Sequence, residues 1–184
     1  METAMSASRI ANVTAAVLVR FGQGARSSSE LADRIEALFE DTLWLGDPPP
    51  DGAPGRFVSV ASAQRDPVTG VAAAIEAARG ERVIVVAATE SARVGAELLL
   101  ALVAWPERAV VMVVEAEQSI PVCAIYRRED LLERARNLLA SASSPTSLET
   151  FLSGLEVERV TLARLGLGGG PHPLFAGREG REAC

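Results

Sequence analysis

The chain has 184 residues, enough for one α/β domain with a sizeable core, and 48% of them are hydrophobic. Its formal net charge is −6, which argues against a nucleic-acid-binding surface, because such a surface needs a basic stripe. With two Trp, one Tyr and five Phe, the chain also offers little aromatic surface on which bases could stack.

All 18 Lys-or-Arg positions are arginine, so a lysine-dependent phosphate loop or Schiff base is excluded. The two cysteines, Cys123 and Cys184, have no framework spacing, and we therefore expect a reduced, cytoplasmic protein. Residues 1–12 lack the pattern of a signal peptide, and no apolar run reaches the roughly 18 residues of a membrane span. We expect neither a membrane nor a nucleic acid as a partner.

The first half of the chain alternates between predicted strands and helices. Residues 13–19 form an apolar, β-branched run typical of a strand buried on both faces. Ser27 and Glu30 have the spacing of a capping box and predict a helix at about 28–41. The inward face of that helix is apolar at helical spacing: Leu31, Ile35, Leu38 and Phe39.

Short strands are expected at 43–46 and 57–61, separated by a loop rich in Pro and Gly. A second helix follows Asp66, whose simplest role is to cap it, and Gly80 stands where a C′ glycine belongs.

The second half continues the alternation. The apolar run at 83–88 predicts the central strand, and a helix at 93–104 follows it. The inward face of this helix is expected to hold Val94, Leu98, Leu99 and Leu102. Strands at 110–114 and 122–127 are close enough in sequence to form a hairpin, which commonly adds an antiparallel member at one side of a parallel sheet.

The last elements are a helix at 130–140, a short helix and a strand at 155–162. Thr146 and Glu149 have capping-box spacing at the start of the short helix, and Gly154 ends it. The buried stripe of the longer helix is predicted to be Leu131, Leu132, Ala135, Leu138 and Leu139.

This pattern predicts an α/β fold, in which a mostly parallel sheet with one antiparallel hairpin lies between two layers of helices. We expect one domain at 13–165, a disordered N-terminus at 1–12 and a Gly-rich C-terminal tail at 166–184.

Two glycines, Gly22 and Gly24, follow the first predicted strand and precede a helix. Backbone N–H groups at such a turn can bind phosphate with help from the helix dipole, and Arg20 and Arg26 would then be the charged partners. The third glycine of a dinucleotide fingerprint is missing, because Ser27 stands in its place. The alternative is an ordinary turn.

Thr89, Glu90 and Ser91 follow the central strand, where open α/β sheets place their ligands. Glu90 could hold Mg²⁺, and the alternative is a solvated loop carboxylate. His172 is the only histidine, which rules out a zinc site built on several histidines and favours an ordinary tail residue. Cys123 lies among apolar residues and is expected to be an inert core thiol.

The segment Pro121-Val-Cys-Ala-Ile-Tyr-Arg-Arg128, followed by a helix, resembles the Pro-Leu-Cys-Ala-Leu-Tyr-Arg segment of the molybdenum cofactor guanylyltransferases. The likeness covers roughly 13–165. Other stretches that are similar, in the same order along the chain, are 66–75, 83–88, 96–99, 147–148 and 157–162. The resemblance implies a Rossmann-like, GT-A-like nucleotidyltransferase fold, with GTP and Mg²⁺ as ligands and Gly70 as a residue that shapes the pocket.

The chain departs from this family where the family's chemistry resides. The family's first loop, Leu-Ala-Gly-Gly-x-Ser-x-Arg-Met-Gly-x-Asp-Lys, is replaced by a shorter one at 18–27 without adjacent glycines or lysine. Thr89 stands where the family has the Asp that binds Mg²⁺, and the late Asn-x-Asn motif is absent. Nucleotidyl transfer depends on charge neutralisation by metal and cationic side chains, so these losses predict little or no turnover.

Three hypotheses follow. The first is a non-catalytic binding or regulatory protein of this fold, which needs no cofactor and acts through a protein partner. The second is a divergent Mg²⁺-dependent nucleotidyltransferase that transfers a nucleotide to a molybdopterin-type acceptor, with Glu90 as metal ligand and Arg20 or Arg26 on the phosphates. The third is a protein-interaction scaffold without a ligand.

Overall fold

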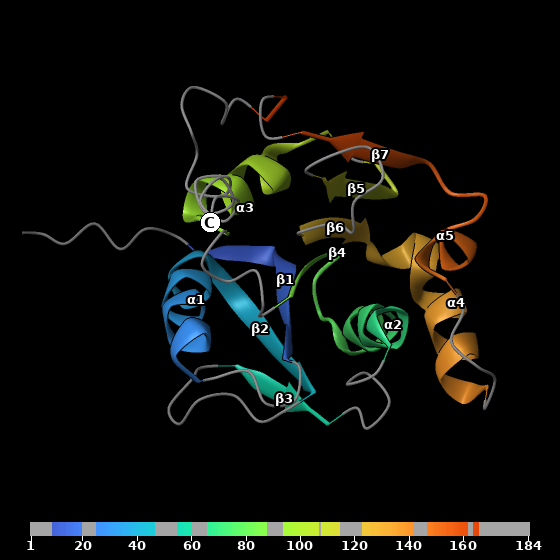
Figure 1. Ribbon diagram of the computed structural model, residues 1–184, viewed down its shortest axis with the longest axis horizontal. Helices are drawn as coiled ribbons and strands as arrows, with labels where there is room; N and C mark the ends of the chain where they lie inside the picture. The colour runs from blue at the N-terminus through green and yellow to red at the C-terminus, as the bar shows by residue number, and fades with distance from the viewer. Residues whose placement is uncertain are drawn as a thin grey trace, which may run out of the picture.

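The computed structural model describes residues 9–19, 25–46, 55–59, 66–87, 94–106, 108–114, 123–141, 147–161 and 164–165, with only the backbone at 19 and 25–30. These residues form a sheet between two groups of helices (Figure 1). In this part of the chain, no helix has the length and apolar character needed to cross a membrane.

The sheet has seven strands in the order β3-β2-β1-β4-β6-β5-β7. Every neighbouring pair is parallel except the two pairs made by β6, which runs antiparallel to β4 and to β5. The strands are β1 (Ile10–Val19), β2 (Phe39–Gly46), β3 (Arg56–Val58), β4 (Arg82–Ala87), β5 (Val110–Val113), β6 (Cys123–Arg127) and β7 (Val157–Val160). The predicted hairpin pairing is confirmed, but its antiparallel strand lies inside the sheet and not at one side.

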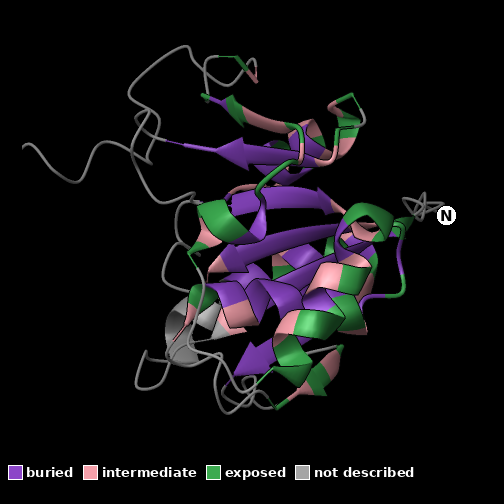
Figure 2. Ribbon diagram, turned by 90° about the vertical axis from the view of Figure 1, so that its right-hand side faces the viewer, coloured by how far each residue is buried: buried purple, intermediate pink, exposed green. Residues whose placement is uncertain are grey.

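The helices cover both faces of the sheet, which confirms the three-layer αβα prediction (Figure 1). One face packs against α1 (Ala25–Leu38) and α3 (Ala96–Ala104). The other packs against α2 (Pro67–Ala77), α4 (Arg128–Ala140) and α5 (Leu148–Phe151). Each face has its own core of buried aliphatic side chains, so the strands between them are buried on both sides, and Figure 2 shows buried residues concentrated in the strands.

The strand that carries the family resemblance, β6, owes its composition to this double burial. Cys123 and Ile125 face the α1/α3 core, whereas Ala124 and Tyr126 face the α2/α4 core. All four are at most 2% exposed. The Cys-Ala-Ile-Tyr pattern is therefore explained by packing, as expected for an inert core thiol.

Burial raises the pKa of the Cys123 thiol to about 12, so the nucleophilic thiolate is scarce at neutral pH. In a Cys184→Ser variant, we expect Ellman's reagent to label no thiol in the native protein and one thiol in denaturant. Rapid labelling of the native variant at pH 7 would show that Cys123 is accessible and would contradict the packing of β6.

Two element boundaries differ from the prediction at the start of the chain. The first strand begins at Ile10 and not at Val13, so residues 10–12 belong to the sheet. The first helix spans Ala25–Leu38, and Phe39, predicted on its inward face, instead begins β2, where it pairs with Ile10. Phe39 still packs into the α1/α3 core, so burial is preserved while strand pairing determines its backbone conformation.

Two predicted caps are also wrong. The C-cap of α2 is Ala78, so Gly80 is not its C′ residue; it lies instead against the backbone of β1. The short helix α5 is capped by Ser147, whose hydroxyl accepts a hydrogen bond from the Thr150 backbone N–H at 3.2 Å, and not by Thr146. Within α4 only Leu131 and Ala135 are buried, and Leu139 of the predicted stripe is exposed.

Candidate functional site

The carboxyl edge of the sheet, where β1, β2, β3, β4, β5 and β7 end, is the candidate site. Strands β1 and β4 are adjacent and parallel there, with Leu18 paired to Ala87. From β1 the chain continues to β2 and β3 on one side, whereas β4 leads to β5 and β6 on the other. This reversal of strand order is the switch point at which open α/β sheets form a ligand crevice.

The sequence-predicted residues adjoin this switch point along the chain. Arg20 directly follows Val19 at the end of β1, and Thr89 and Glu90 come two and three residues after Ala87 at the end of β4. Arg20, Gly22, Gly24, Thr89 and Glu90 lie outside the described residues, as does the side chain of Arg26. Arg26 is the second residue of α1, and the N-terminus of this helix follows β1 along the chain.

The N-terminus of α2 lies at the same edge and is closed by Asp66. Its carboxylate accepts hydrogen bonds from Val68 N–H at 3.0 Å, Thr69 N–H at 3.2 Å and the Thr69 hydroxyl at 2.7 Å. Gly70 is buried in the first turn, and its N–H donates to the Asp66 carbonyl oxygen. The predicted capping role of Asp66 is confirmed, and its oxygens are already engaged.

The N-terminus of α3 differs, because its N-cap is Gly95, which has no side chain to form a capping hydrogen bond. A Cβ added at Gly95 would meet none of the described residues within 4 Å, apart from its neighbours in the chain. Helices α1 and α3 each follow a strand that ends at the carboxyl edge, so their partially positive N-termini face the candidate site and favour an anion there, whereas the N-terminus of α2 is already occupied by the Asp66 carboxylate. Among the side chains that the structure places, no group of three or more His, Cys, Asp or Glu could hold a metal ion.

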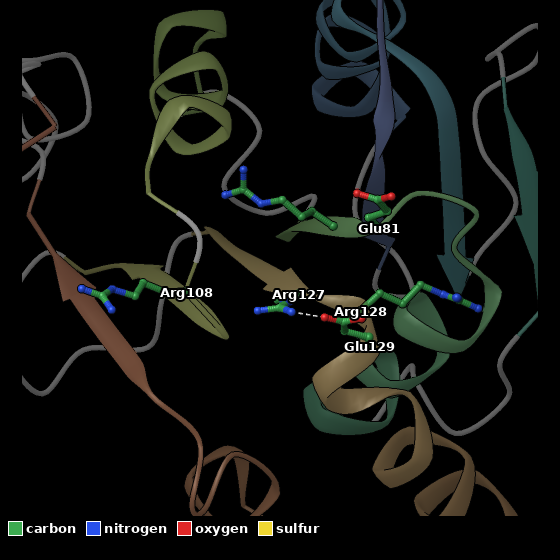
Figure 3. A pocket seen from close by; sticks show the side chains of 6 residues that line it. Glu81, Arg108, Arg127, Arg128 and Glu129 are labelled. Atoms are coloured by element: carbon green, nitrogen blue, oxygen red, sulfur yellow. Dashed lines mark hydrogen bonds and ion pairs between the residues drawn. The ribbon is translucent and has the colours of Figure 1, made fainter.

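A hollow of about 360 Å³ lies at the opposite, amino edge of the sheet (Figure 3). Sequence reasoning missed the residues that line it, which are Glu81, Arg82, Arg108, Arg127, Arg128 and Glu129. Figure 3 shows Arg108 and Arg128 pointing in opposite directions, with Arg127 turned toward Glu129, so the guanidinium groups do not converge on a common centre.

Two arginines of this hollow cap helix ends. Neither α2 nor α3 has a basic residue in its last turn, although the carbonyls there carry partial negative charge. Arg82 donates to the carbonyl oxygens of Val103 at 2.8 Å and Leu102 at 3.3 Å, and Arg128 donates to that of Ile75 at 3.1 Å. Their position is thus explained by helix capping from neighbouring elements.

The other two arginines form exposed ion pairs. Arg108 contacts Glu156 at 3.0 Å and Glu158 at 3.9 Å, and Arg127 pairs with Glu129 and with Asp130. Exposed pairs of this kind contribute little to stability. We therefore interpret the amino-edge hollow as a junction between elements and place the candidate site at the carboxyl edge.

A polar network centred on Asp41 joins β1, β2, β3 and the turn before β4. Asp41 accepts a hydrogen bond from the Thr14 hydroxyl at 2.7 Å and a bidentate pair from Arg56, whose Nε donates to Oδ1 at 3.1 Å and whose Nη2 donates to Oδ2 at 2.9 Å. Thr14 is fully buried, and its hydroxyl accepts from Gly80 N–H at 2.9 Å. Burial alone would raise the pKa of Asp41, but the bonds from Thr14 and Arg56 and the charge of Arg56 outweigh it and lower the pKa.

No protein-family model matches the sequence, and no curated protein matches it significantly. Solved structures do resemble the fold. A protein of Aquifex aeolicus VF5 (Aq1419) is 15% identical with a TM-score of 0.64, covering 83% of this chain and 90% of that one. The 4-diphosphocytidyl-2C-methyl-D-erythritol synthase of Anaerococcus prevotii is 11% identical with a TM-score of 0.57, covering 82% and 89%.

A third similar structure is the 2-C-methyl-D-erythritol 4-phosphate cytidylyltransferase of Thermus thermophilus, 15% identical with a TM-score of 0.54, covering 79% of this chain and 87% of that one. At these identities the likeness establishes the fold alone. The chain therefore shares the Rossmann-like αβα fold of these structures.

Proposed function

We propose that this protein binds a nucleoside triphosphate at the carboxyl edge without transferring the nucleotide, and that it acts through a protein partner. The observation that carries the proposal is the pairing of β1 with β4. Because β1 and β4 are paired, the segments that follow Val19 and Ala87 begin at neighbouring strand ends. The N-terminus of α1, with Arg26 in its first turn, supplies a site for phosphate at the same place.

The absence of transfer follows from the chemistry of the residues at these positions. A nucleotidyltransferase stabilises the phosphates of its transition state with a metal ion and cationic side chains. Thr89 cannot replace a metal-binding carboxylate, and the chain has no lysine. Asp66, a carboxylate of the same edge, already accepts three hydrogen bonds within α2.

Two arguments bear on the identity of the base. The likeness of the segment 121–128 to the molybdenum cofactor guanylyltransferases favours GTP and a partner in the handling of that cofactor. Two of the similar solved structures are a 4-diphosphocytidyl-2C-methyl-D-erythritol synthase and a cytidylyltransferase, and these names favour CTP. We take GTP as the first candidate, because the resemblance extends over the order of the elements.

A thermal-shift screen with GTP, CTP, ATP and UTP, with and without Mg²⁺, tests the proposal. A nucleotide at 100 times its Kd adds about 2.7 kcal/mol to the free energy of unfolding, which raises the melting temperature measurably. We expect a shift with GTP, and a shift with CTP alone would reassign the base. If no nucleotide changes the melting temperature, the nucleotide proposal fails and the ligand-free scaffold remains.

The second candidate is a divergent active nucleotidyltransferase, favoured by the place of Arg26 at the start of α1. In that case Glu90 would hold Mg²⁺, and pyrophosphate would be released from GTP with a molybdopterin-type acceptor. The Glu90→Ala variant separates the two candidates. It would abolish pyrophosphate release in an enzyme, whereas our proposal predicts no release from either protein.

A further inference from the structure

Several arginines of this chain donate hydrogen bonds to backbone carbonyl oxygens at the C-terminal end of a helix that is not their own. Arg82 and Arg128 bind the last turns of α3 and α2. Arg56 donates to the last residue of α2 at 3.0 Å, and Arg134 donates to the last residue of α5 at 3.1 Å. A cation is stabilised at such a place, because the last carbonyl groups of a helix carry partial negative charge.

Arg34 differs from these arginines, because its carbonyl partner stands at the beginning of a helix. Its Nη1 donates to the carbonyl oxygen of Val94 at 3.3 Å, and Val94 directly precedes Gly95, the N-cap of α3. The N-terminus of a helix carries partial positive charge, so a guanidinium gains nothing there from the helix dipole. The dipole of α3 therefore does not explain why a cation lies at this end of the helix.

The bond from Arg34 joins two helices that both begin at the carboxyl edge. Helices α1 and α3 lie on the same face of the sheet, and they follow β1 and β4, which are neighbouring strands (Figure 1). Val94 is fully buried in the same core as Leu31 and Ile35 of α1. Long side chains of a helix point back toward its N-terminus, which for α1 is the end at the carboxyl edge. The bond therefore fixes the start of α3 relative to α1.

We propose that Arg34 is a positioning residue for the nucleotide site, because it holds the first turn of α3 in the place that the bound phosphates require. This inference rests on the proposed function. Backbone N–H groups at helix starts bind an anion tightly only when the surrounding residues hold them in a fixed geometry. The charge of Arg34 has the unfavourable sign for the dipole of α3, but both attract an anion at the carboxyl edge. Binding of a phosphate would thus explain a placement that helix stability does not.

The affinity of the full chain for GTP with Mg²⁺, measured by isothermal titration, tests the proposal in two matched variants. Arg34→Gln removes the guanidinium and keeps a residue that favours a helix. Arg134→Gln is the control, because Arg134 is also a half-buried helical arginine that donates to backbone carbonyl oxygens, on the opposite face of the sheet. Both variants lose bonds of the same kind, so we expect them to melt at similar temperatures.

We expect Arg34→Gln to bind GTP about tenfold more weakly than the unmodified protein, and Arg134→Gln to bind it equally well. Arg34→Lys keeps the charge and a donor, so its affinity should return to within about threefold of the unmodified protein. Equal affinities of the two glutamine variants would overturn this inference and leave the proposed function standing. A lysine variant no better than Arg34→Gln would also overturn it, because lost packing would then explain the weaker binding. If the unmodified protein bound no nucleotide, the proposed function would fail and this inference with it.

Discussion

Replacement of Gly80 by alanine is expected to lower the free energy of unfolding by about 3 kcal/mol, since the added methyl group has no space. An ideal Cβ at Gly80 would lie 2.7 Å from the Asn12 carbonyl oxygen and 2.8 Å from Thr14 N. Both are backbone atoms of β1, which pairs with β2 and β4 and cannot move aside alone. The measurement is urea unfolding followed by circular dichroism.

Gly95→Ala is the matched control, because a Cβ there meets nothing within 4 Å in the part of the chain that the structure describes, and its backbone is extended, with φ −78°. We expect a change within about 0.5 kcal/mol at this position. If Gly80→Ala is as mild as Gly95→Ala, the close approach of the turn before β4 to β1 is wrong.

Removal of the Asp41 carboxylate should have the second large effect. In Asp41→Ala, Arg56 loses its bidentate partner, and the hydroxyl of the fully buried Thr14 loses its acceptor. We expect a loss of about 2–3 kcal/mol, less than for a fully buried pair because the Arg56 side chain is 32% exposed. Glu36→Ala is the control, since Glu36 pairs with Arg9 at 3.9 Å on the surface and should contribute little.

The same residue predicts a pH dependence. The folded protein holds the pKa of Asp41 below its ordinary value of 3.8, so the unfolded chain binds a proton more readily than the folded one. The stabilisation is complete above about pH 5 and is lost as the pH falls through the folded pKa. In Asp41→Asn, the free energy of unfolding should fall less steeply below pH 5, and an unchanged slope would contradict the network.

The fold was predictable because its strongest signals are local. Apolar β-branched runs indicated the strands of the sheet, and the short link between 110–114 and 122–127 predicted the antiparallel pairing of β5 with β6. The place of β6 inside the sheet was not predictable, since it depends on pairing with β4, which lies more than 30 residues earlier. Phe39 shows the same limit, because pairing with Ile10 overrides its helical spacing.

For the site, sequence order alone identified which loops follow β1 and β4, but not that these strands are neighbours. The roles of the polar residues at the amino edge could not be predicted from the sequence. Asp41, Arg56 and Arg82 bind partners that are distant along the chain. Gly80 was misassigned for a similar reason. A glycine after a helix is usually a cap, and nothing nearby in the sequence reveals the strand that passes beside it.

The measurement that tests the central claim most directly is the affinity for GTP with Mg²⁺, by isothermal titration, in two matched double variants. Arg20→Ala/Arg26→Ala removes the arginines that follow β1, and Arg108→Ala/Arg127→Ala removes two arginines of the amino-edge hollow. We predict that the first variant binds GTP at least tenfold more weakly than the unmodified protein, because each charged contact to phosphate contributes about 1.5 kcal/mol or more to the binding free energy. We predict that the second variant binds GTP like the unmodified protein. Loss of binding in the second variant alone, or no binding of any nucleotide to the unmodified protein, would contradict a nucleotide site at the carboxyl edge.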